Sequence, residues 1–106
     1  MFNARSWLDE LACRRPPGCA VLTQELIDQV GAPPQSPPPG TPAGELIQYY
    51  KEVNVLSLNA DDRFVVATNR AMGLNATGNE AEYAEARAEA AFWAHVRDWT
   101  KPLANS

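Results

Sequence analysis

Proline is concentrated in residues 32–42, where Ala-Pro-Pro-Gln-Ser-Pro-Pro-Pro-Gly-Thr-Pro holds six of the nine prolines of the chain. Proline fixes φ and has no amide hydrogen to donate, so this stretch is neither a helix nor an inner strand. We expect an extended polyproline II connector between an N-terminal helical lobe, 1–31, and a C-terminal helical lobe, 43–101. Because each lobe is short for an independent domain, we expect both to pack together as one domain, 1–106.

The N-terminal lobe carries start and stop signals for two short helices. Asn3 or Ser6 is placed to cap a helix that runs through Arg14. Thr23 is placed to cap a second helix, which Gly31 ends. The apolar side of each helix follows the same spacing, with Trp7, Leu8 and Leu11 in the first and Leu26, Ile27 and Val30 in the second.

The C-terminal lobe begins with Thr41-Pro42, a capping residue followed by a proline, which is typical of a helix start. Apolar residues follow at helical spacing, at Leu46, Ile47, Tyr50 and Val53. Residues 53–68 allow two interpretations. Their β-branched runs, separated by Asn-Ala-Asp-Asp, are compatible with a β-hairpin. Asn59 as a cap and Gly73 as a stop instead indicate a helix, which we prefer because it explains both ends.

The most complete helix signal lies between Asn79 and Thr100. Asn79 is a capping residue, Glu82 stands three positions on in capping-box register, and Pro102 blocks extension. One face collects the side chains expected in the core, namely Ala81, Ala84, Ala88, Phe92, Val96 and Trp99. The sequence therefore predicts an all-α fold, a compact bundle of about five helices with a Pro-rich extended connector. The alternative is an α+β fold with the hairpin at 53–68.

Charge and hydropathy disfavour several kinds of partner. Nine Lys and Arg against thirteen Asp and Glu give a net charge of −4, whereas nucleic-acid binders usually carry a basic excess on one face. The alternative that we keep is a helical DNA-binding regulator. In it, the helices at 60–72 and 79–100 would form the pair that reads the DNA. No apolar run approaches the ~20 residues that are needed to cross a bilayer. Acidic residues near the N-terminus interrupt the stretch that would have to be apolar in a signal peptide. We expect no membrane association and a cytoplasmic location, or the host cytoplasm or a virion if a phage encodes the chain.

Residues that carry chemistry are few. Cys13 and Cys19 flank a Pro-Pro-Gly turn, which is compatible with a disulfide, but we favour two reduced thiols beside the turn. His95 is the only histidine, with Asp98 one turn on and no nucleophile placed beside it. We expect a packed histidine and keep a small enzyme using His95 as the least favoured alternative. The Cys and His residues are too few for a zinc site, and no catalytic signature stands out, so we expect no enzyme, no metal and no cofactor.

Polar and aromatic side chains of the last helix predict a contact surface for another protein. Three carboxylates lie within about 60° of one another on that helix, which indicates either a solvated face or an acidic stripe for a partner with a basic surface. Tyr and Trp are enriched at interface hot spots, and two such residues of this helix fall outside its apolar face. Tyr49 and Tyr50 are chain neighbours and cannot share one helix face. The expected interface residues are Glu82, Tyr83, Glu85, Glu89, Trp93 and Tyr49.

These observations favour a small non-enzymatic protein that binds another protein through an acidic and aromatic helix surface. Two settings fit this hypothesis. One is an assembly or structural component, for which a homo-oligomer is compatible with the sequence. The other is an inhibitor that blocks a basic groove of its target, and in either setting a phage or another mobile element would encode the chain.

Overall fold

The structure, a computed structural model, describes residues 2–33 and 36–105. Within these ranges the chain is helical and contains no strand, so the all-α prediction is confirmed and the hairpin at 53–68 is wrong. Four α-helices are followed by one short 3-10 helix: α1 (Ala4–Arg14), α2 (Gln24–Val30), α3 (Ala43–Thr77), α4 (Glu80–Thr100) and η1 (Lys101–Asn105).

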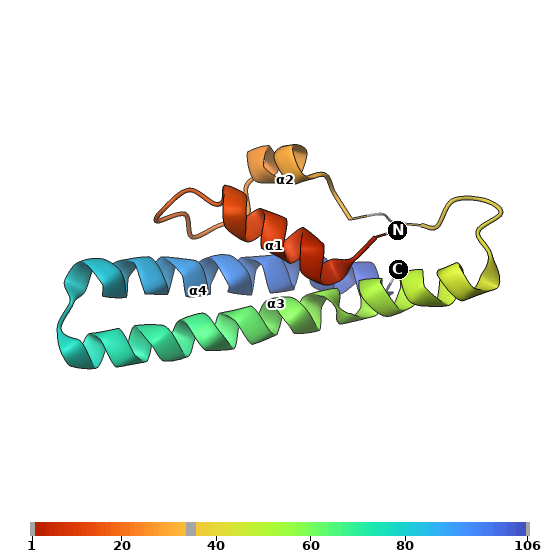
Figure 1. The fold of residues 1–106 in the computed structure, drawn as a ribbon. Coiled ribbons are helices and arrows are strands. Elements are labelled where there is room, and N and C mark those ends of the chain that lie inside the picture. The colour runs from red at the N-terminus through yellow and green to blue at the C-terminus, as the bar shows by residue number, and fades with distance from the viewer. Residues whose placement is uncertain (1, 34–35, 106) are drawn as a thin grey trace.

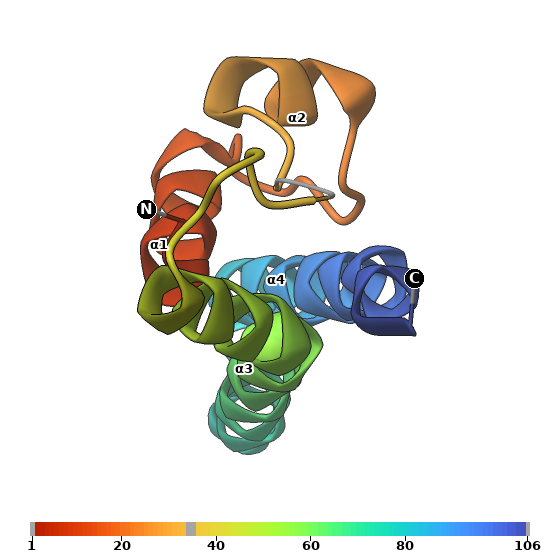
Figure 2. The same cartoon turned by 90° about the vertical axis from the view of Figure 1, so that its right-hand side faces the viewer.

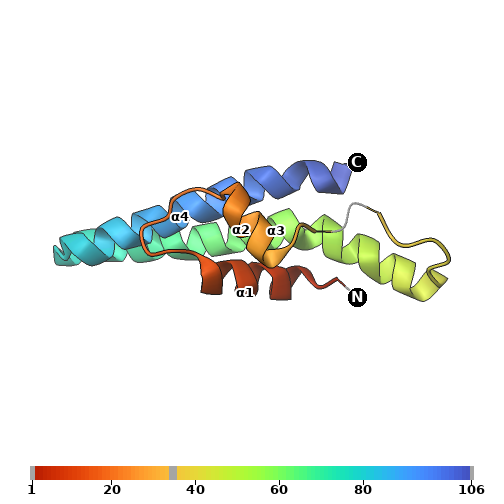
Figure 3. The same cartoon turned by 90° about the horizontal axis from the view of Figure 1, so that it is seen from above.

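Helices α3 and α4 form a long antiparallel hairpin that sets the length of the molecule, whose extents are 55 × 24 × 19 Å (Figure 1). Helix α1 packs against α3, and α2 packs against α1. Seen down the long axis, α1 and α4 lie on the same side of α3 and leave its opposite side uncovered (Figure 2). Both ends of α3 extend beyond α1 (Figure 3).

Helix α3 is a single helix of 35 residues where the sequence predicts two. Asn59 and Gly73, expected as a cap and a stop, both lie inside it. An interior glycine costs a helix about 1 kcal/mol relative to alanine. We attribute the continuity to packing, because buried side chains recur on one side of α3 from Tyr49 to Ala71, and this burial outweighs a local penalty of that size.

The local end signals of the other helices are confirmed. Side-chain oxygens of Asn3, Thr23 and Asn79 accept hydrogen bonds from the backbone N–H groups at the starts of α1, α2 and α4. Gly31 ends α2 with φ 91° and Gly78 ends α3 with φ 77°. Thr41 does not cap α3, because its hydroxyl donates to the carbonyl of Pro38.

The Pro-rich connector is described only in part, since Pro34 and Gln35 lie outside the described residues. Its extended polyproline II conformation therefore stays a prediction. The amide and the hydroxyl of Thr41 both donate to the carbonyl of Pro38, so residues 38–41 form a hydrogen-bonded turn just before α3.

The core lies where α1, α2 and the middle of the hairpin meet. Trp7 of α1 stacks on Trp99 of α4, with ring centroids 6.1 Å apart. Large rings thus fill the space between α1 and α4. The buried cluster contains Ala4, Trp7, Leu8, Leu11, Leu22, Leu26, Ile27, Leu56, Ala60, Ala67, Ala90, Phe92, Trp93 and Val96.

The buried side of α4 differs from the face expected from its sequence. Phe92 and Val96 are buried as expected, but Ala81 and Ala84 are exposed, and Trp93 is buried instead. The physical reason is that α4 has two neighbours. It packs against α3 on one side and faces α1 and the segment before α2 on another, so its buried surface is wider than a single stripe.

Candidate protein-interaction surface

The acidic side chains expected to meet a partner are partly used within the chain. Glu85 accepts hydrogen bonds from Arg15 Nη1, at 2.6 Å, and from the backbone amide of Gly18. Glu89 lies 3.5 Å from Arg70 Nη1. Glu82 is exposed in the first turn of α4. The three carboxylates therefore do not form one free acidic stripe.

The Arg15–Glu85 pair fixes the loop after α1 onto α4. The guanidinium of Arg15 is nearly buried and lies over the ring of Phe92, 5.6 Å from its centroid. The hydrogen bond from Arg15 holds the pKa of the Glu85 carboxyl below its usual range. Because Glu85 binds its own chain in the charged form, its charge stabilises the fold rather than remaining free for a basic partner.

Two of the aromatic residues expected at the surface are buried, which corrects the prediction for them. Trp93 is 2% exposed and Tyr49 is 7% exposed. Trp93 meets the ring of Phe92 edge-on at 5.0 Å, and the guanidinium of Arg63 lies 5.1 Å from its centroid. Burial raises the pKa of Tyr49. Their helices have neighbours on these sides, which periodicity within one helix does not reveal.

Tyr83 stays partly exposed near the tip of the hairpin. The guanidinium of Arg87 lies 5.7 Å from its ring centroid, one turn along α4. Of the six residues expected at an interface, Glu82 and Tyr83 thus keep accessible surface without an ion pair in the part of the chain that the structure describes.

His95 and the two cysteines have structural surroundings. The backbone amide of Leu22 donates a 2.6 Å hydrogen bond to His95 Nδ1, so the imidazole accepts in its neutral form and holds the segment before α2 against α4. Cys13 and Cys19 are both free thiols, and Cys19 Sγ donates to the carbonyl of Val21. The disulfide considered for this pair is not formed in the structure.

Most of the exposed large apolar side chains in the described residues lie on α3, a surface that the sequence analysis did not select. Of the seven exposed large apolar side chains in the described residues, six belong to α3 and the seventh is Val21. Soluble chains expose single apolar residues routinely, but the concentration of several along one helix is typical of an interaction site. The six residues of α3 are Ile47, Tyr50, Leu58, Val65, Val66 and Met72.

Four of these side chains form a row on the side of α3 opposite to the core. At 100° per residue, Ile47, Leu58, Val65 and Met72 fall within about 40° of one another, while the buried residues of α3 centre on the far side. Their exposed fractions run from 46% to 71%. We call this row the outer face of α3.

The sequence does contain the signal for this face. Leu58, Val65 and Met72 follow one another at intervals of seven residues, the spacing of a helix seam. A seam and a core stripe have nearly the same period, so the residues alone do not tell which row meets the chain's own core.

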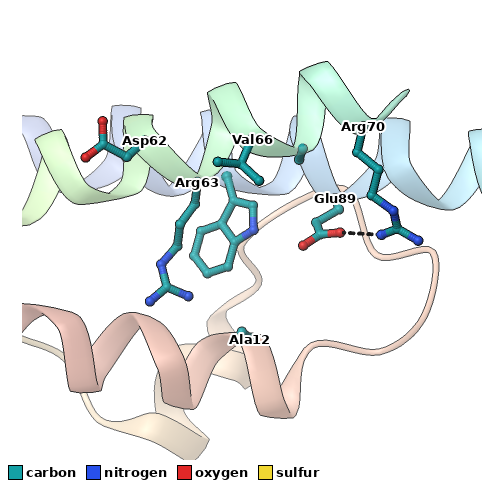
Figure 4. Close-up of a pocket in the computed structure, with 8 residues that line it drawn as sticks. Ala12, Asp62, Arg63, Val66, Arg70 and Glu89 are labelled. Atoms are coloured by element: carbon teal, nitrogen blue, oxygen red, sulfur yellow. Dashed lines mark hydrogen bonds and ion pairs between the residues drawn. The ribbon is translucent and has the colours of Figure 1, made fainter. Parts of the chain in front are cut away.

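A shallow cavity of about 400 Å³ opens between α1, α3 and α4, beside the outer face of α3. Val66 and Ala12 line its apolar part, and Arg63 and Asp62 border it (Figure 4). Arg70 and Glu89 point toward one another at its edge (Figure 4). Two cations and two carboxylates leave the lining without a net charge, so the cavity has no electrostatic preference for an anion or a cation.

The described part of the chain holds neither a metal-ligand cluster nor a membrane-spanning helix. No three His, Cys, Asp or Glu side chains are grouped there so as to hold a metal ion. None of the described helices combines the length and the apolar character needed to cross a bilayer.

Comparison with known proteins finds no matching family model, no matching curated protein and no matching solved structure.

Proposed function

We propose that this chain is a non-enzymatic protein-binding module that takes up its partner along the outer face of α3. One observation carries the proposal, which is that Ile47, Leu58, Val65 and Met72 form an exposed apolar row on the side of α3 turned away from the core. Covering such a row removes apolar surface from water, which is the main source of free energy in protein association.

The charges support an assembly or structural component over an inhibitor of a basic groove. An inhibitor of that kind needs free carboxylates, whereas Glu85 and Glu89 face Arg15 and Arg70 of their own chain. Two of the interface residues expected from the sequence, Glu82 and Tyr83, stay accessible near the hairpin tip, and Tyr83 and Met72 line one hollow there. We propose that Glu82 and Tyr83 add to the contact area. The two free thiols fit a reducing compartment, for which we propose the cytoplasm of the host cell.

The test is a comparison of captured partners. The wild-type chain, the double variant Leu58→Glu/Val65→Glu and the control Val21→Glu are each immobilised and exposed to extract of the cells that make the protein. Val21 is a matched control because it is a large exposed apolar residue outside the outer face of α3. We expect partners held by the wild type and by the control to be lost from the double variant. Retention of the same partners by the double variant would contradict the proposal.

A further inference from the structure

The outer face of α3 also carries charges whose arrangement indicates what covers it. We propose that its occupant is a second copy of this chain, whose α3 lies antiparallel against the first. This inference rests on the proposed function, because it names the partner of the same face. It follows from the positions of Lys51 and Asp62 relative to the apolar row.

Room for a second helix exists on this side of α3. Contacts with α1 and α4 come mainly from the other side, where the buried residues of α3 lie, as when Glu52 accepts from the Ala4 amide at 2.8 Å. Asp61, about 40° from the centre of the row on the flank opposite to Lys51, is already paired with Arg97 of α4 at 2.9 Å. The apolar row from Ile47 to Met72 is roughly 37 Å long at 1.5 Å per residue. Another helix is the element whose side chains fit such a row.

Lys51 and Asp62 border this row on the same flank, about 40–60° from its centre at 100° per residue. Both are exposed, and neither takes part in an ion pair among the residues that the structure describes. When two copies of one helix pair antiparallel about a two-fold axis, each flank meets the same flank of the other copy. Lys51 of one copy is therefore placed to reach Asp62 of the other.

One register pairs the charges together with two of the four residues of the apolar row, while Leu58 lies opposite Asn54 of the other copy. If Ile47 of one copy lies opposite Val65 of the other, Lys51 falls about one residue, or 1.5 Å of axial rise, from Asp62 of the other copy. The symmetry repeats both contacts, giving two apolar pairs and two ion pairs. The two Asp62 side chains are then roughly 18 Å apart along the axis, beyond the screening length of physiological salt.

The rival register pairs Leu58 of one copy with Val65 of the other. It joins the two apolar residues directly, but it brings Asp62 opposite Asp62 across the two-fold axis. The two Asp62 carboxylates would then repel each other, and no cation of the outer face lies beside them. The charges therefore select the register centred near Leu56 over the one centred between Asp61 and Asp62.

The experiment is a charge exchange followed by sedimentation velocity over a range of concentrations. The wild type is expected to sediment as a dimer that dissociates on dilution. Lys51→Glu and Asp62→Lys each replace two attractions by two repulsions, and we expect each to raise the dimer dissociation constant about tenfold or more. The double variant Lys51→Glu/Asp62→Lys restores opposite charges and is expected to recover the wild-type constant. Lys101→Glu, an exposed change of the same sign outside the outer face, serves as the control.

The outcomes separate this inference from the proposed function. A wild-type chain that stays monomeric at every concentration overturns the inference of a dimer. If Leu58→Glu/Val65→Glu still loses its captured partners in that case, the proposed function holds without the dimer. A dimer that neither single change weakens, or that the double change does not restore, overturns the antiparallel register. Circular dichroism on each variant shows whether the helices are intact, so that unfolding is not mistaken for dissociation.

Discussion

Glu85 and Arg15, 70 residues apart in the sequence, form an ion pair of 2.6 Å that joins α4 to the loop after α1. The amide of Gly18 donates to the same carboxylate, and ten residues further along α4 the imidazole of His95 accepts from Leu22. Three polar contacts thus hold the segment that leads from α1 to α2 along one side of α4.

Glu85→Gln is expected to lower the free energy of unfolding by about 1 kcal/mol at neutral pH, because a charged hydrogen-bond acceptor becomes a neutral one. In the folded chain the pKa of Glu85 lies below that of an unfolded chain, about 4.3, so the unfolded state binds more protons in that range. The stabilisation by the Glu85 charge is fully present above pH of about 4.3. It is lost as the pH falls through the lower pKa that Glu85 has in the folded chain.

Urea denaturation of the wild type and of Glu85→Gln across this pH range measures the effect. The difference between the two proteins isolates Glu85, since the other carboxylates titrate in both. We expect this difference in the free energy of unfolding to shrink as the pH falls below about 4.3. A difference that stays constant down to pH 2 would mean that the charge of Glu85 contributes nothing to the fold.

His95→Ala is expected to release the segment before α2, because the Leu22 amide loses its acceptor. The cost is about 1 kcal/mol, with faster hydrogen exchange at the Leu22 amide. His95→Asn is the matched control, because its side-chain oxygen is placed near the position of the imidazole Nδ1 and restores an acceptor. Equal exchange rates for Leu22 in the wild type and in His95→Ala would show that this hydrogen bond does not hold the segment.

Gly73→Ala is expected to stabilise the protein by about 1 kcal/mol, because alanine is the better helix former and nothing lies within 4 Å of the added methyl group. Gly78→Ala is expected to destabilise it by a similar amount, since Gly78 ends α3 with φ 77°, which side chains disfavour. Thermal unfolding of both variants measures whether each change raises or lowers the stability relative to the wild type. The same sign for both would contradict a continuous α3 that ends at Gly78.

Trp93→Ala is expected to cost about 3–5 kcal/mol, because it opens a cavity between α3 and α4 and removes the ring beneath Arg63. That is a large fraction of the stability of a domain this size. Val66→Ala, an exposed apolar residue at the edge of the same cavity, should change stability by less than about 0.5 kcal/mol. Chemical denaturation of both variants decides whether Trp93 belongs to the core.

The ends of most helices were predictable because they are decided within one turn of chain. The caps at Asn3, Thr23 and Asn79 and the stop at Gly31 depend on a side chain and a backbone group a few residues apart, and the structure has all of them. Where such a signal competes with burial along a long helix, as at Asn59 and Gly73, packing prevails and the local prediction fails.

The sequence by itself determined where α2 and α4 begin and that α4 ends before Pro102. It favoured an all-α chain but left open the hairpin at 53–68 and the choice of Asn3 or Ser6 as the cap of α1. Only the tertiary structure decided which sides of the long helices are buried. Helix α4 has apolar or small residues around most of its circumference, so its period does not choose a face. Trp93 is buried because its side of α4 faces α3 and also residues of α1 such as Ala12. Leu58 and Val65 stay exposed because α1 and α4 both contact α3 from its other side.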